Sequence, residues 1–282
     1  MSARPKAQPL HFALRLTSLT FRSPLIIPLL LTLWSAPLSS TPSPTLSATP
    51  VPSVKLTSEC VTFISKLRAS QRDPAQVAQL FAPPKKPRWR YRGAKKKLFS
   101  EVAPTAGDGM IEALYTGETR APNGHKAPSG FNCEHLWPRA WMGGRRDPLF
   151  REKEADLHNL FPSVMRVNSR RGHLPFGLVK TPTTDIASPS VIGTSDGRGE
   201  RIQPRPERRG DVARALVYMA SRWQLRWPSP HRDLLIEWSK QDPPDERERR
   251  RDERISALQG NGNPLVRCPE ALPELLALLK LP

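Results

Sequence analysis

The sequence predicts one α+β domain in which helices flank a small central sheet. Apolar residues recur at helical spacing in the stretches 58–81 and 211–223, and a third helix is expected from about residue 245 to residue 259. A short β-type run lies at 111–115, and 131–172 has the pattern of strand, loop, strand and helix in succession. Together these stretches indicate the α+β class.

The clearest predicted helix begins at Asp211. Its apolar face is formed by Val212, Leu216, Met219 and Trp223. This spacing of i, i+4, i+7 and i+11 predicts a face that packs in the core. A shorter amphipathic stretch follows at 234–238, and Gly260 is expected to end the helix that begins near Asp245.

Three other segments carry weaker patterns. A short helix is expected from Tyr91 onward, whereas 182–209 is rich in Ser, Thr, Gly and Pro and is predicted to be a loop. The run 247–254 alternates Arg with acidic residues, which predicts a solvated helix face with i,i+4 ion pairs. Basic and aromatic residues mix at 85–97, which suits either a contact with a phosphate backbone or a solvated linker.

The N-terminal residues have the order of a secretory signal. Basic residues come first, with no acid before Glu59, then an apolar run at 24–34, then small residues at 35–40. The apolar run is too short and too interrupted by proline for a membrane span of about 20 residues. No stable membrane insertion is therefore expected after signal cleavage.

The 282-residue chain carries a formal net charge of +18, which favours a polyanionic partner such as nucleic acid. Its three cysteines are Cys60, Cys133 and Cys268. An exported protein could pair two of them, and the spacing does not say which. Cys133 could be a free thiol facing the core or one end of a disulfide.

The residues with catalytic potential lie in 131–172. Glu134 and Asn168 offer the oxygen ligands that a hard divalent cation prefers, and magnesium needs only a few protein ligands. His135, as a neutral imidazole, could take a proton from an attacking water, and an arginine could brace a phosphate. Ser163 is the expected N-cap of the helix in this stretch, and Gly172 lies near its end.

One geometric condition applies to this cluster. Consecutive residues of a regular strand point to opposite faces. Glu134 and His135 can serve one site only if the strand is twisted or ends there, and the nearby Pro138 makes an irregular end plausible.

Several ordered motifs resemble those of the bacterial endonuclease I family of secreted nucleases. Residues 134–138 (EHLWP) resemble its EHxWP signature, 156–160 (DLHNL) its DxHNL, and 167–172 its VNxxRG. Three further stretches agree, namely 114–117 (LYTG), 209–214 (RGDVAR) and 259–264 (QGNGNP). The resemblance runs from about residue 91 to residue 266.

The resemblance implies a ββα-metal (His-Me finger) nuclease core. Glu134 and Asn168 would hold one Mg²⁺, with Mn²⁺ or Ca²⁺ as alternatives, and His135 would be the general base. Asn159 would fix a loop behind these residues. The family also places an arginine on the scissile phosphate, which Arg146 or Arg171 would supply, with Arg145 as a further candidate.

The resemblance also implies the activity and its setting. The protein would be a Mg²⁺-dependent endonuclease, secreted or periplasmic and monomeric, that cleaves DNA and also RNA with low sequence specificity and leaves 5′-phosphates. The competing interpretation is a non-catalytic basic protein that binds extracellular nucleic acid or an anionic surface. The expected organisation is a signal peptide at 1–40, a Pro/Ser/Thr-rich linker at 41–57, a helical and basic extension at 58–90, a catalytic domain at 91–268 and a C-terminal tail at 269–282.

Overall fold

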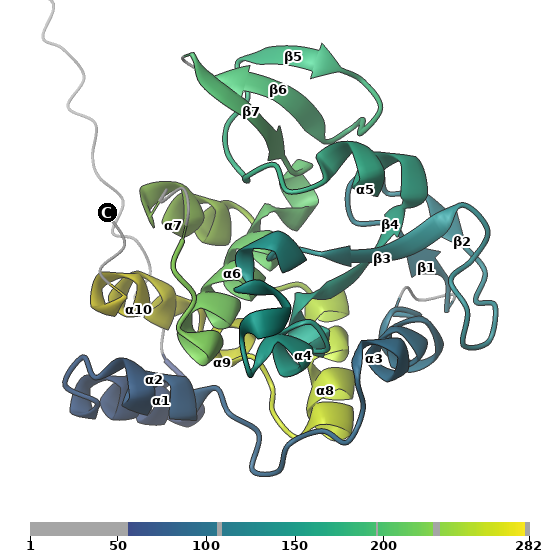
Figure 1. Ribbon diagram of the computed structural model, residues 1–282. Helices are drawn as coiled ribbons and strands as arrows, with labels where there is room; N and C mark the ends of the chain where they lie inside the picture. The colour runs from purple at the N-terminus through teal and green to yellow at the C-terminus, as the bar shows by residue number, and fades with distance from the viewer. Residues whose placement is uncertain (1–55, 106–108, 196, 228–231, 280–282) are drawn as a thin grey trace, which may run out of the picture. The chain divides into compact units, whose positions relative to one another are not determined.

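The computed structural model describes residues 56–105, 109–195, 197–227 and 232–279 (Figure 1). The predicted signal peptide and the predicted linker up to residue 55 lie outside the described residues. The helices are α1 (Ser58–Ala69), α2 (Pro74–Leu80), α3 (Tyr91–Lys97), α4 (Phe150–Lys153), α5 (Met165–Arg171), α6 (Arg209–Trp223), α7 (Arg232–Gln241), α8 (Glu246–Gln259), α9 (Pro264–Arg267) and α10 (Leu272–Leu278). Short helical turns are η1 (Leu98–Val102), η2 (Arg139–Trp141), η3 (Gly144–Arg146), η4 (Leu157–Asn159), η5 (Pro206–Arg208) and η6 (Pro269–Ala271).

The strands form three small antiparallel sheets, so the α+β class is confirmed, whereas a single central sheet is not found among the described residues. The first sheet pairs β1 (Ile111–Glu112) with β2 (Thr119–Arg120), and the second pairs β3 (Phe131–His135) with β4 (Leu160–Val164). The third orders β5 (Thr181–Thr184), β6 (Val191–Ser195) and β7 (Arg198–Gln203). Two-stranded sheets are only marginally stable by themselves, so these depend on the helices that cover them.

Helix α6 lies in the middle of the helical part, with α7 and α9 beside it (Figure 1). Val212, Leu216 and Met219 are buried, which confirms the predicted core face. The helix is in fact buried on nearly all sides, from Gly210 to Ser221. A Cβ at Gly210 would collide with the carbonyl oxygen of Asp242, so glycine is required where α6 passes the end of α7.

Residues 56–90 lie in the same compact unit as the residues that follow them. Asp73 caps α2, and the chain reverses between α1 and α2 instead of forming one helix over 58–81. Phe81 packs edge-on against Tyr218 of α6, with 5.7 Å between ring centroids. A disulfide joins Cys60 to Cys268, which ties α1 to the end of α9.

The prediction of a loop over 182–209 is wrong, because this segment contributes β5, β6 and β7. Its outer strand β5 is mostly exposed, which explains why a sequence of Thr and Pro can form it. Gly193 of β6 is required by close approach, since a Cβ there would meet the carbonyl oxygen of Thr181.

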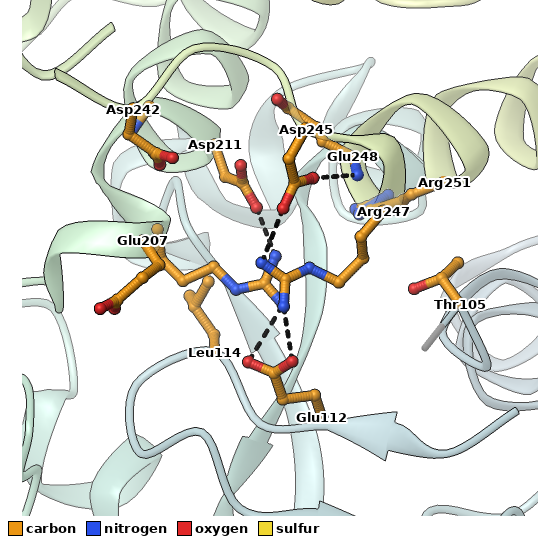
Figure 2. Close-up of polar contacts among 12 residues, drawn as sticks. Thr105, Glu112, Leu114, Glu207, Asp211, Asp242, Asp245, Arg247, Glu248 and Arg251 are labelled. Carbon is orange, nitrogen blue, oxygen red and sulfur yellow. Dashed lines mark hydrogen bonds and ion pairs between the residues drawn. The ribbon is translucent and has the colours of Figure 1, made fainter. Parts of the chain in front are cut away.

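A network of ion pairs joins the β1–β2 hairpin to α8 (Figure 2). Glu112 of β1 contacts Arg205, Arg208 at 3.3 Å and Arg247 at 2.6 Å. The guanidinium of Arg247 lies between Glu112 and Asp245, the N-cap of α8. The predicted solvated face of 247–254 is therefore wrong at this residue.

Helix α8 also inserts Arg251 into the protein. Its Nη2 donates to the carbonyls of Leu157 (2.8 Å) and Leu160 (2.7 Å), at the start of β4. The expected i,i+4 pairing is present between Arg250 and Glu246. One face of the helix is thus solvated, and the other holds the loop that precedes β4.

The predicted C-terminal tail packs back as η6 and α10, where Leu272, Leu275 and Leu276 are buried. Among the described residues, every helix is too short or too polar to cross a membrane.

Candidate active site at the end of strand β3

The candidate site is built on β3, β4 and α5, which follow in the predicted order of strand, loop, strand and helix. In the antiparallel register, Glu134 faces Phe161 and His135 faces Leu160. Ser163 is not the N-cap of the helix, because it pairs with Asn132 in the sheet, and α5 begins only at Met165. Gly172 ends α5 with a φ of 53°, as predicted.

Glu134 is a buried carboxylate whose side-chain partners meet at one oxygen. Its Oε1 accepts hydrogen bonds from the Tyr115 hydroxyl at 2.6 Å and from Nη1 of Arg171 at 3.0 Å. Burial raises the pKa of Glu134 above its ordinary value, although Arg171 and Tyr115 both oppose the rise. Arg171 and Tyr115 thus offset only part of the cost of burying the charged form of Glu134.

Arg171 is fully buried between β3 and α5. Besides Glu134, its guanidinium donates to the carbonyl oxygens of His135 (3.0 Å) and Leu136 (2.9 Å). Its outer face lies 4.7 Å from the ring centroid of Phe176. In this position Arg171 orients Glu134 and the end of β3, and its guanidinium is out of reach of a phosphate in solvent.

Asn168 turns its amide nitrogen toward β3. Nδ2 donates to Oδ1 of Asn132 (2.8 Å) and to the carbonyl of Cys133 (3.1 Å). Its own Oδ1 accepts no hydrogen bond from the described residues. This half-buried amide oxygen is therefore available to an additional partner.

The two predicted oxygen ligands lie on the same side of the contact between β3 and α5. Asn132 and Glu134 are two residues apart on β3 and share a strand face. Asn168 and Arg171 are three residues apart on α5 and share a helix face. Asn168 contacts Asn132 and Arg171 contacts Glu134, so α5 bonds to both residues of this strand face.

His135 is the last residue of β3 and is held by a different set of partners. Its Nε2 lies 3.0 Å from the carbonyl oxygen of Glu154, so Nε2 carries the hydrogen and Nδ1 keeps a lone pair. Burial lowers the pKa of His135 to about 4, and Arg139 and Arg171 add to the effect. The imidazole is therefore neutral at neutral pH, the state that a general base requires.

Two residues that the sequence did not single out as site residues contact the predicted base, Tyr91 through its ring and Glu154 through its backbone carbonyl. The ring of Tyr91 lies 5.0 Å from that of His135, and the guanidinium carbon of Arg139 lies 5.7 Å from the Tyr91 ring. Arg139 also stacks on Phe150 and pairs with Glu154 at 2.8 Å. The contacts run in a closed circuit from His135 through Glu154 and Arg139 to Tyr91 and back.

Tyr115 was also missed as a site residue. The motif at 114–117 marked its segment, but its bond to Glu134 spans 19 residues and has no local signal. Burial holds the pKa of Tyr115 well above its ordinary value, so the hydroxyl stays a hydrogen-bond donor.

Asn159 clamps the chain where it leaves β3. Its Oδ1 accepts from the backbone N–H of Trp137 at 2.7 Å, and its Nδ2 donates to the carbonyl of Trp137 at 3.1 Å. Its own carbonyl accepts from the N–H of Leu136. The strand ends at His135, which meets the condition that the sequence set for Glu134 and His135.

Arg145 and Arg146 lie in η3 and are exposed. Neither forms an ion pair with a described residue, so both guanidiniums are free to meet an anion. They differ in this from Arg171, which is already bonded.

Cys133 is a free, buried thiol that directly precedes Glu134. Burial is the main cause that raises its pKa to about 12, so it remains a neutral part of the core. Cys60, Cys268 and Glu270 also lie together, but the two cysteines are joined in the disulfide and offer no thiolate to a metal.

The profile of the Endonuclease I family matches residues 103–270, which is more than half of the chain. The chain therefore belongs to the Endonuclease I family. All of the predicted site residues fall within the matched range.

Three relatives illustrate the range of this family. An extracellular ribonuclease of Bacillus subtilis (strain 168) is 33% identical over 183 residues, covering 57% of this chain and 60% of the relative. A periplasmic deoxyribonuclease of Aeromonas hydrophila is 34% identical over 134 residues, covering 45% and 56%. An extracellular deoxyribonuclease of the same organism is 33% identical over 152 residues, covering 49% and 65%. The chain thus spans less than two thirds of the length of each of these relatives.

Proposed function

We propose that this protein is an exported, metal-dependent endonuclease that hydrolyses phosphodiester bonds in DNA and RNA with low sequence specificity. Membership of the Endonuclease I family supports a nuclease. The names of its relatives include both ribonucleases and deoxyribonucleases, extracellular and periplasmic. The order of basic, apolar and small residues at 1–40 supports export.

Glu134 and Asn168 would hold the metal of a ββα-metal core. Their donors are one carboxylate and one amide oxygen, a set that suits Mg²⁺, with Mn²⁺ or Ca²⁺ as alternatives. The fit is supported by the incompletely compensated charge of Glu134 and by the unoccupied hydrogen-bonding capacity of Asn168 Oδ1. When bound, the ion would neutralise charge that develops on the phosphate and the leaving oxygen.

His135 would act as the general base. Donation from Nε2 to the Glu154 carbonyl fixes the tautomer, so Nδ1 is the atom that would accept the proton of the attacking water. Burial keeps the ring uncharged before the substrate arrives. The proposal depends mainly on one observation: His135 has a neutral, oriented imidazole and directly follows the buried carboxylate of Glu134.

We propose different roles for Arg171 and Arg146. Arg171 positions Glu134 and the end of β3, and Asn159 holds the chain behind His135. Arg146, with Arg145 beside it, is exposed and unpaired among the described residues, so it suits the contact with the scissile phosphate. We further propose that the enzyme is monomeric and leaves 5′-phosphate ends, which end-labelling of the products would check.

The test is a cleavage assay on plasmid DNA and on RNA, with Mg²⁺ and with EDTA. We expect cleavage that requires the metal, and a loss of about 10²–10⁴-fold in His135→Ala, the usual contribution of a general base. The exposed His125→Ala is the matched control and should keep its activity. Full activity of His135→Ala would reject the base, and salt-sensitive binding without any cleavage would instead support a non-catalytic basic protein.

A further inference from the structure

An exposed group of cations lies next to the candidate active site. We call it the basic segment, and it consists of Arg88, Arg90, Arg92, Lys95 and Lys96. All five side chains are exposed, and none forms an ion pair with a described residue. The sequence holds no acidic residue between Asp73 and Glu101, so this positive charge has no local compensation.

The cations that flank the basic segment behave differently. Lys86 lies 3.7 Å from Glu152, and Lys97 pairs with Glu101 at 3.3 Å and lies 5.2 Å above the Trp89 ring. The charges between them are left uncompensated, although neighbouring lysines find partners. Uncompensated positive charge repels itself and costs stability unless an anion is bound.

Helix α3 connects the basic segment to the predicted base. Tyr91, at the start of α3, places its ring 5.0 Å from the ring of His135. Arg92, Lys95 and Lys96 lie on the same short helix as Tyr91. Through Tyr91, the basic segment lies next to His135 at the end of β3.

The basic segment is also held in place by the core. Ala94 of α3 is buried, and so are Leu98, Phe99 and Val102 in the turns that follow. For residues 91–97, the interpretation as a solvated linker does not agree with this packing. An ordered row of cations can follow a polyanion without first paying the entropy of ordering the backbone.

We propose that the basic segment is a second contact surface for the substrate, which binds the phosphate backbone beside His135. The inference rests on the proposed nuclease function, which makes nucleic acid the polyanion that reaches His135. Contacts of this kind are electrostatic and independent of sequence, and they release counterions in proportion to the phosphates neutralised. They would hold a long strand while the scissile bond lies at His135.

The experiment measures binding of labelled single-stranded DNA and RNA in EDTA, where metal-dependent cleavage is absent, over a range of salt concentrations. The test variant replaces all five residues of the basic segment by Gln. The control replaces five exposed cations elsewhere that have no ion-pair partner among the described residues, namely Lys66, Arg72, Arg226, Lys240 and Arg249. Both variants lose the same net charge, so a difference between them reports position alone.

We expect the slope of log affinity against log salt to fall by about 0.7 for each lost phosphate contact on a single strand. A decrease of roughly two or more in the test variant, with at least a tenfold weaker affinity, and little change in the control would support the inference. A third variant with Lys at the three arginine positions should keep the parent slope, which separates lost charge from altered folding. Equal slopes in test and control variants would overturn the inference, as would unchanged oligonucleotide binding together with lost binding to anionic phospholipid vesicles.

The two proposals fail separately in this design. A parent protein that binds strands through the basic segment but never cleaves them would refute the nuclease and keep the contact surface. A parent that cleaves normally, with equal slopes in both variants, would support the nuclease and refute the contact surface.

Discussion

Glu112 and Glu134 are both largely buried carboxylates, and their surroundings differ in one respect. Glu112 contacts three arginines through both oxygens, Arg205 and Arg208 at Oε1 and Arg247 at Oε2. Glu134 receives one arginine and one tyrosine, both at Oε1. The first carboxylate is surrounded by positive charge, and the second is not.

This difference distinguishes a carboxylate with a structural role from one that we propose as a metal ligand. Each of the three arginines around Glu112 also pairs with a second carboxylate, namely Glu207, Asp211 or Asp245, so the charges there are already matched within a network. At Glu134, burial outweighs the stabilisation by Arg171 and Tyr115 and raises the pKa of the carboxyl, and we propose that a metal ion supplies the remaining compensation. A buried acid therefore indicates a metal site only after its partners have been counted.

The largest effect is expected from Glu112→Gln. The amide keeps the shape but leaves three arginines without their shared anion, and the side chain is only 15% exposed. We expect the free energy of unfolding to fall by about 3 kcal/mol, near the lower end of the cost of breaking a buried ion pair. Urea denaturation measures this change.

Glu118→Gln is the control for this prediction. Glu118 contacts Arg120 at 2.9 Å and Arg166 at 3.7 Å but is 31% exposed. Its loss should cost less than about 1 kcal/mol, as is usual for surface pairs. Equal costs at both positions would show that the arginines around Glu112 do not depend on its charge.

The next largest effect is expected from Glu134→Gln, and it falls on activity. Loss of the ligand charge should lower the rate on the order of 100-fold, about 2.7 kcal/mol of barrier, together with the binding of Mg²⁺. Stability should change less than in Glu112→Gln, because the amide oxygen can still accept from Tyr115 and Arg171. Initial rates and titration calorimetry test this, and unchanged values for both would reject Glu134 as a metal ligand.

The smallest effect is expected at His158. This buried histidine is a base, and it can be compared with the two buried acids. Its Nε2 donates to the carbonyl of Asn261 at 3.0 Å, and its ring lies 4.3 Å from that of Tyr218. Burial lowers the pKa of His158, although Asp156 and Asp252 oppose this and only Arg251 adds to it. The folded protein therefore keeps this ring neutral.

The sign of the pH effect follows from that shift. Below about pH 6.5, His158 is protonated in the unfolded chain but stays neutral in the folded protein. The free energy of unfolding therefore falls as the pH decreases further. His158→Gln should flatten this part of the stability curve relative to the exposed control His173→Gln. Identical curves for the two variants between pH 7.5 and pH 5, measured by urea denaturation, would contradict the prediction.

Local patterns in the sequence were sufficient for some elements and not for others. The spacing of Val212, Leu216 and Met219 predicted the buried face of α6, because helix periodicity is visible within a few residues. The strands at 181–203 were missed, since an exposed edge strand of Thr and Pro has the composition of a loop. Ser163 was misassigned because a serine before a helix resembles an N-cap even when it pairs in a strand.

The sequence by itself predicted the chemical groups of the candidate site and placed them on strand and helix, because Glu134, His135, Asn159 and Asn168 belong to short motifs. Only the tertiary structure decided that Arg171 is bonded to Glu134, that Tyr91 contacts His135 and that Cys60 pairs with Cys268. It also brought Arg247 to Glu112, a contact that spans 135 residues. Such contacts form when distant segments pack, and the periodicity of either segment carries no information about its partner.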